Sequence, residues 1–279
     1  MKTFGDTNTN NKIVLAVFGD IHGALDEMFE TCKLYENIYQ EEIDYILQTG
    51  DMGVFHSGSV LDKATKRFAK EDPTELGCIL YISGVKEAPI PVIFVAGNHE
   101  DFDFLKKCDN NYIDPYNKIF HISSGSVYQI NKGDISITLA GIDGIKPTGK
   151  SEEVVRSKIG RSFYSQRAID KLLCYSPGSV DILLCHEAPI SDELLKLYPD
   201  GGSEDIRAVI ERLKPKFCFY GHYKHPPDPF HILDTICIGT NNPRYYQLKT
   251  RESNMIRVEV IKHKNTLHWS YKLLNKNEL

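Results

Sequence analysis

The 279-residue sequence lacks the features of a membrane-spanning or disulfide-stapled protein. No apolar run approaches the roughly 18 residues of a membrane span. The polar residues 1–12 contain no apolar stretch of the kind that marks a signal peptide. The seven cysteines are odd in number and scattered, without a CxxC pair. We therefore expect reduced thiols, a cytoplasmic location and no membrane partner.

The sequence also has no excess of positive charge. Its 33 Lys and Arg residues against 38 Asp and Glu residues give a formal charge of −5, which excludes a uniformly basic nucleic-acid coat but not a local basic groove. No internal repeat and no linker rich in Pro, Gly or Ser divides the chain. We therefore expect one domain over residues 13–279, preceded by a flexible tail over residues 1–12.

The first part of the chain alternates short apolar runs with amphipathic segments. Apolar residues recur at spacings of three and four between residues 25 and 39, which predicts a helix, and a weaker helical pattern covers residues 61–68. The apolar runs, expected to be strands, are 13–18, 44–47 and 91–96. This order predicts an α/β fold, with helices on the faces of a sheet.

The later part of the chain mixes this pattern with antiparallel signals. Alternating residues around Lys132-Gly133-Asp134 predict a hairpin of strands 126–130 and 135–140. Helices are expected over 165–173 and over 203–213, with Ser203 as the N-cap. Two further strands are expected at 180–185 and 216–220. The tail is expected to add antiparallel strands at 235–238, 255–261 and 267–271.

Five of the apolar runs end in short polar motifs. The motifs are Gly19-Asp20-Ile21-His22-Gly23, Gly50-Asp51-Met52-Gly53, Gly97-Asn98-His99-Glu100, Cys185-His186 and Gly221-His222-Tyr223-Lys224-His225. Polar residues at the carboxyl ends of sheet strands are where α/β sheets place ligands. Carboxylate oxygen together with imidazole nitrogen suits first-row divalent metals, and the mixture argues against a structural zinc site.

Each motif alone has an ordinary structural explanation. A single His186 is more often a satisfied structural histidine, and Asp20 or Asn98 can simply close a turn. The ordered set of five is much harder to explain in that way, so a shared metal site is the favoured interpretation. His56, His121 and His231 belong to no motif and are expected to be structural.

Together, these motifs resemble those of the calcineurin-like metallophosphoesterase superfamily, over residues 13–226. The middle of the chain is most similar to the RNA lariat debranching enzymes, in the segments 81–89, 92–100, 132–145, 180–189 and 213–217. The resemblance implies a four-layer α-β-β-α sandwich built on two mixed sheets. It also implies two divalent metal ions, Mn, Fe or Zn with Mn favoured, and a metal-bridged hydroxide that attacks phosphorus.

The resemblance also assigns roles to single residues. His99 would be the general acid or would stabilise charge on the phosphate, and Asn98 would contact a phosphate oxygen as well as a metal. The implied metal ligands are Asp20, His22, Asp51, Asn98, His186 and His222. An imidazole suits the acid role because it titrates near neutral pH.

Three features depart from the usual pattern of the superfamily. Many members carry GDxxD, in which the second Asp orients the catalytic His, but Val54 stands there in this chain, as a non-acidic residue does in the debranching enzymes. Many debranching enzymes carry Cys where this chain has Asp20, so we expect a fuller two-metal site. The usual GHxH is here GHYKH, which leaves His225 either a metal ligand or a solvent-facing or phosphate-contacting residue.

The sequence thus supports three hypotheses of function. The favoured one is a phosphodiesterase whose phosphoester substrate is RNA or a nucleotide; no protein partner is indicated. The alternative is a phosphomonoesterase, a protein Ser/Thr or nucleotide phosphatase, although the Arg of the GDxxDRG motif is absent from residues 50–56. The third is an inactive scaffold that keeps the fold. The mixed-charge stretch 144–161 is either a phosphate-contacting loop or a solvated surface loop.

Overall fold

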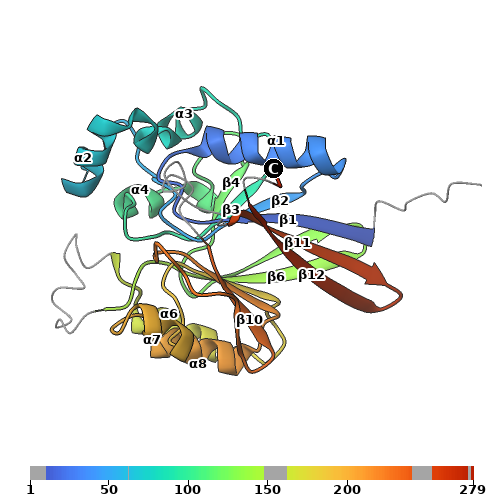
Figure 1. Ribbon diagram of the computed structural model, residues 1–279. Coiled ribbons are helices and arrows are strands. Elements are labelled where there is room, and N and C mark those ends of the chain that lie inside the picture. The colour runs from blue at the N-terminus through green and yellow to red at the C-terminus, as the bar shows by residue number, and fades with distance from the viewer. Residues whose placement is uncertain (1–10, 62, 148–161, 241–252, 276–277) are drawn as a thin grey trace, which may run out of the picture.

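A computed structural model of the chain describes residues 11–61, 63–147, 162–240, 253–275 and 278–279. Two six-stranded sheets pack face to face, and helices cover both outer faces (Figure 1). This arrangement confirms the expected four-layer α-β-β-α sandwich. Within the described residues, no helix has the length and apolar character needed to cross a bilayer. Most of the mixed-charge stretch 144–161, and residues 1–10 of the expected tail, lie outside the described residues.

The first sheet is built around four parallel strands. Its strands, in spatial order, are β12 (Thr266–Asn275), β11 (Ser253–His263), β1 (Lys12–Phe18), β2 (Tyr45–Gln48), β3 (Val92–Phe94) and β4 (Ile119–His121). Strands β1 to β4 pair in parallel, and the hairpin of β11 and β12 adds to the β1 edge in antiparallel fashion. The first strand begins at Lys12, a residue that the sequence had placed in the expected tail.

The second sheet repeats this plan with four parallel strands at its centre. Its strands are β5 (Val127–Lys132), β6 (Ile135–Ile142), β7 (Ile182–Cys185), β8 (Phe217–Tyr220), β10 (Thr235–Gly239) and β9 (Phe230–Ile232). The predicted hairpin is confirmed as β5 and β6. The expectation that 235–238 is wholly antiparallel is wrong, because β9 forms the antiparallel edge and leaves β10 to pair in parallel with β8.

The hydrophobic core forms three layers because the central strands bury both faces. Along β1, Ile13, Leu15 and Val17 point between the two sheets. Val14, Ala16 and Phe18 of the same strand point to the helices over the first sheet. Successive side chains of a strand face opposite sides, so a continuous apolar run is the pattern of a strand buried on both faces.

The helices lie in two groups, one on each outer face (Figure 1). Helix α1 matches the predicted range 25–39, and α8 begins after the predicted cap Ser203, whose side chain accepts a hydrogen bond from the backbone N–H of Ile206. The helical segments are α1 (Leu25–Tyr39), α2 (Lys63–Glu71), η2 (Pro73–Leu76), α3 (Cys78–Ile82), α4 (Phe102–Leu105), η3 (Asp109–Asn111), α6 (Gln166–Leu173), α7 (Asp192–Leu197) and α8 (Glu204–Leu213). The short helices α3, α4 and α7 were not predicted, since they span too few residues to show a helical period.

An ionic cluster outside the motifs ties the loop after α1 to the first sheet. The Glu41 carboxylate accepts hydrogen bonds from Arg257 Nε at 2.7 Å and Nη2 at 3.0 Å, and also from the Tyr35 hydroxyl and the Lys12 ammonium group. Burial opposes ionisation of Glu41, but these donors outweigh it and hold its pKa low, at about 2.

We expect Glu41→Gln to flatten the acid limb of the stability curve. The folded carboxyl has a pKa of about 2 against an ordinary value of 4.5, so the wild type loses stability as the pH falls through this window. The Gln variant is less stable than the wild type at neutral pH and loses less on acidification. Urea unfolding at several pH values measures this. The exposed neighbour Glu42→Gln is the matched control, and equal slopes for the two variants would contradict the assignment.

Candidate metal centre

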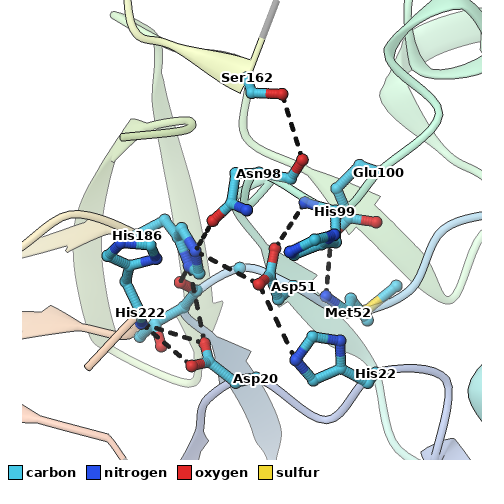
Figure 2. Close-up of polar contacts among 12 residues, drawn as sticks. Asp20, His22, Asp51, Met52, Asn98, His99, Glu100, Ser162, His186 and His222 are labelled. Atoms are coloured by element: carbon cyan, nitrogen blue, oxygen red, sulfur yellow. Dashed lines mark hydrogen bonds and ion pairs between the residues drawn. The ribbon is translucent and has the colours of Figure 1, made fainter. Parts of the chain in front are cut away.

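The predicted site residues come from loops at the carboxyl ends of parallel strands in both sheets. Asp20, Asp51 and Asn98 follow β1, β2 and β3 of the first sheet. His186 and His222 follow β7 and β8 of the second sheet. Figure 2 shows these side chains turned toward one another. The packing of the two sheets therefore brings together residues that are separated by up to 202 positions in the chain.

Asp20, Asp51 and His186 form the buried centre of this group. Each offers one ligand atom, and these atoms lie within 4.8 Å of one another. His186 is fully buried, with Nδ1 3.7 Å from Asp20 Oδ1 and Nε2 3.6 Å from Asp51 Oδ2. Two carboxylate oxygens and an imidazole are a donor set that suits Mn, Fe or Zn.

The hydrogen bonds of His186 fix which ring nitrogen faces the site. Nδ1 lies 2.9 Å from the Thr49 carbonyl oxygen, which can only accept, so Nδ1 carries the proton. Nε2 then presents a lone pair toward Asn98 Oδ1, 3.1 Å away, and toward Asp51. Lone pairs that converge in this way repel one another unless a proton or a metal ion lies beside them. A histidine held by a backbone carbonyl is also the usual arrangement of a metal ligand.

The electrostatics of the two carboxylates support the same conclusion. Burial raises the pKa of Asp20. Burial also opposes ionisation of Asp51, but the neighbouring histidines, His186 first among them, outweigh it and lower its pKa. Two carboxylates buried side by side are costly without a compensating positive charge. The residues present therefore fit a divalent cation.

His22 lies on the other side of Asp51 and has a carboxylate of its own. Its Nε2 is 3.9 Å from Asp51 Oδ2, and its Nδ1 is 3.4 Å from Oε1 of the buried Glu75 in η2. Burial opposes protonation of His22, but Glu75 and the two aspartates outweigh it and raise the pKa of the ring. Glu75 thus holds the His22 ring with one nitrogen toward Asp51. Nothing in the sequence around 73–76 signals this role.

Asn98 and His99 lie at the mouth of the group. The backbone N–H of His99 donates to Asp51 Oδ1 at 2.8 Å, and its ring lies 5.9 Å from the ring of His22. The Asn98 carbonyl oxygen accepts a hydrogen bond from the Ser162 hydroxyl at 3.2 Å. Both residues are partly exposed, so a substrate can reach them.

The two histidines after β8 differ in their relation to the centre. The backbone N–H of His222 donates to both oxygens of Asp20, at 3.2 and 3.1 Å, and its ring lies 5.2 Å from that of His186. Both histidines are exposed, but the backbone N–H of His225 donates to the Tyr198 hydroxyl, at 3.0 Å, and not to a residue of the centre. The structure thus places His222 beside the centre, whereas the role of His225 as a ligand stays a prediction.

The glycines of the motifs leave room for the site side chains. A Cβ on Gly97 would lie 2.1 Å from Asp51 Oδ1, and one on Gly50 would lie 2.4 Å from His186 Nδ1. A Cβ on Gly221 would lie 2.6 Å from Asp20 Oδ1. No real Cβ packs so closely, so these positions require glycine because backbone and side chain touch there.

Glu100, the last residue of the third motif, braces the loop that carries Asp51. Its carboxylate accepts hydrogen bonds from the backbone N–H groups of Met52 at 2.7 Å and Val54 at 2.5 Å. Burial raises the pKa of Glu100 to about 8. Val54, which stands at the position of the second Asp in GDxxD, is therefore fixed through its backbone. The sequence assigned Glu100 to a motif but gave it no role.

The family of the chain follows from comparison with known proteins. The sequence profile of the calcineurin-like phosphoesterases matches residues 13–226. This range includes all five motifs described above, but not the tail strands β11 and β12. The chain belongs to the calcineurin-like phosphoesterase family. The resemblance noted in the sequence is therefore confirmed at the level of the family.

Among curated proteins, this chain is similar to lariat debranching enzymes. It is 26% identical over 239 aligned residues to the enzyme of Arabidopsis thaliana. The aligned region covers 75% of this chain and 54% of the plant protein. It is 24% identical over 259 residues to the enzyme of Entamoeba histolytica, which covers 83% of this chain and 71% of that protein. This chain thus spans only about half the length of the plant relative.

A solved structure of a phosphatase from Mycoplasma pneumoniae is also similar to this chain. The two share 12% identity, with a TM-score of 0.47, over 96% of this chain and 95% of the other. Because this TM-score is low, the fold is defined by the strand order and layers described above and not by similarity to that structure.

We expect Gly97→Ala to weaken divalent-metal binding. The added Cβ would lie 2.2 Å from the backbone nitrogen of Asp51 as well as against its carboxylate, so Asp51 must move. Calorimetric titration with Mn²⁺ and thermal unfolding measure the effect. Gly178→Ala is the matched control, since nothing lies within 4 Å of its Cβ and only the backbone cost at a φ of +77° remains, about 1–2 kcal/mol. Equal Mn²⁺ affinity of the two variants would contradict this role of Gly97.

Proposed function

We propose that this phosphoesterase is a divalent-metal-dependent phosphodiesterase that acts on RNA or nucleotides. The observation that carries the proposal is the convergence of Asp20, Asp51 and the Nε2 lone pair of His186, with Asn98 Oδ1 facing the same point. The similarity to lariat debranching enzymes supports a diester substrate.

The residues fall into two overlapping sets around Asp51. Asp20 and His22 would hold one metal ion, Asn98, His186 and His222 would hold the other, and Asp51 lies between the two sets. His225 is proposed as a further ligand or as a phosphate contact. When bound, such ions neutralise phosphate oxygens and make a water molecule nucleophilic at neutral pH. The chain supplies the ligands, and Glu75, Glu100 and Thr49 fix their orientation.

His99 is the proposed proton donor to the leaving oxygen. Its backbone N–H is held by Asp51, so its ring starts from a fixed position at the mouth of the site. Val54 replaces the acid that orients this histidine in many relatives, and it brings no carboxylate near the ring. Asn98, the preceding residue, offers a neutral amide to a phosphate oxygen without adding negative charge.

The first test compares two small substrates in the presence of Mn²⁺. We expect faster hydrolysis of bis-p-nitrophenyl phosphate, a diester, than of p-nitrophenyl phosphate, a monoester. Clear preference for the diester supports the proposal and leads to 2′,5′-branched RNA as the next substrate. Preference for the monoester would favour the phosphatase alternative. Failure to bind Mn²⁺, Fe²⁺ or Zn²⁺ in metal analysis of the purified protein would favour the inactive scaffold.

We expect His99→Ala to slow diester cleavage in proportion to the basicity of the leaving oxygen. General acid catalysis is worth roughly 10²–10⁴-fold, so a dinucleotide with an alkoxide leaving group loses most. Hydrolysis of bis-p-nitrophenyl phosphate, whose leaving oxygen needs little help from a proton, loses less. His231→Ala, an exposed histidine outside the motifs, is the control. Equal losses on both substrates would show that His99 stabilises charge and does not deliver a proton.

A further inference from the structure

A cavity of about 700 Å³ opens beside the metal centre, on the side of His99. Asn98 and His99 belong to its lining, together with residues from the loop after β2, from the segment 100–107 that contains α4, and Ser162. This volume falls within the range of roughly 300–1,000 Å³ that is usual for small-molecule sites. The motifs did not predict the cavity, because residues 55–61 and 101–107 carry no pattern that points to a ligand.

Aromatic side chains line the cavity next to the site. Phe55, Phe102 and Phe104 contribute phenyl rings, and His56 contributes an imidazole. The His56 and Phe104 rings lie 5.1 Å apart at an interplanar angle of 41°. Both residues are partly exposed, as is Phe102, so their rings remain accessible to a ligand. Stacking on such rings tolerates any nucleobase, since every base has a π-face.

The charges of the cavity argue against a second phosphate group there. Among the described residues of the lining, Glu100, Asp101 and Asp103 carry carboxyl groups and Lys107 carries the one ammonium group. The Asp101 carboxylate also caps α4 by accepting hydrogen bonds from the backbone N–H groups of Asp103 and Phe104 at 3.1 and 3.0 Å, and it lies 3.7 Å from His56 Nε2. The described part of the lining is thus more acidic than basic, which favours a flat, uncharged group over a second phosphate.

We propose that this cavity binds the nucleobase of the leaving nucleoside. The inference rests on the proposed function, because it takes His99 as the donor to the leaving oxygen and the ligand as part of a phosphoester. The phosphate lies at the metal centre, His99 lies at the junction, and the base stacks on Phe104 and His56. The cavity thus selects a nucleoside, rather than a sugar or a peptide side chain, on the leaving side of the scissile bond.

The test measures binding by calorimetry to the Mn²⁺-loaded protein. The probes are adenosine 2′-monophosphate, adenosine 5′-monophosphate, ribose 5-phosphate and O-phospho-L-tyrosine. At least one adenylate should bind roughly tenfold or more tightly than ribose 5-phosphate, the gain expected from base stacking. Adenylates that bind no better than ribose 5-phosphate would overturn the proposal. Phosphotyrosine that binds as tightly as the adenylates would also overturn it, since the cavity would then accept any aryl group.

Variants of Phe104 assign the gain to this cavity. Phe104 also packs against the first core layer, so Phe104→Ala can unfold the protein, and Phe104→Leu keeps the apolar bulk without the ring. The preference for adenylate over ribose 5-phosphate should fall by roughly fivefold or more in Phe104→Leu, the loss of one base–aromatic contact. Tyr116→Leu, an exposed aromatic residue outside the cavity, should keep the preference. A preference that survives in Phe104→Leu would refute the assignment.

A further pair of probes separates failure of this inference from failure of the proposed function. Adenosine and ribose carry no phosphate, so their binding reports on the cavity alone. Tighter binding of adenosine than of ribose, abolished in Phe104→Leu, would support the cavity even if no phosphoester is hydrolysed. Hydrolysis of the diester without any preference for adenosine would leave the proposed function standing and overturn the inference.

Discussion

The structure depends on two carboxylates, Asp20 and Asp51, that are buried side by side where the two sheets meet. They are 6% and 4% exposed, and their ligand atoms lie within 4.8 Å of each other and of His186. Two like charges at that separation repel by roughly 3–4 kcal/mol, even at an effective dielectric constant of about 20. Positive charge nearby offsets this repulsion. The neighbouring histidines supply part of it, and the residues present fit a divalent cation.

The backbone is strained at the residues that converge on the centre. Asp20, His22, Asp51 and His222 all have positive φ angles, between 37° and 68°, a region that residues with a side chain seldom adopt. Hydrogen bonds between the loops hold them there, among them His22 N–H to the Asp51 carbonyl oxygen at 2.8 Å. Such strain persists where the surrounding structure fixes it, and here the two packed sheets supply that rigidity.

The sequence predicted the parts of the site that are local, and missed the parts that depend on tertiary contact. His186 was recognisable because it directly follows a buried strand, and Asp51 because it comes three residues after one. The acceptor for His186, by contrast, is a backbone carbonyl at Thr49, which any residue type could offer. Glu75 lies in a four-residue 3₁₀ helix, too short to have a period, and it reaches His22 only through the fold. For the same reason the pairing of β10 was wrong: strand direction depends on β9, a three-residue edge strand with little signal.

The segment from Asn98 to Phe104 connects the metal centre, the proposed acid His99 and the aromatic cavity. Asn98 faces His186 at the metal centre, and His99 is held by Asp51 through its backbone. The same chain then continues through Glu100, which braces the Asp51 loop, to Phe104 in the wall of the aromatic cavity. A ligand that presses on Phe104 therefore acts on the short, hydrogen-bonded segment that carries the proposed acid. In this arrangement, the proposed recognition of the leaving group and the proposed delivery of its proton belong to one structural unit, because Phe104 follows His99 by five positions along one braced segment.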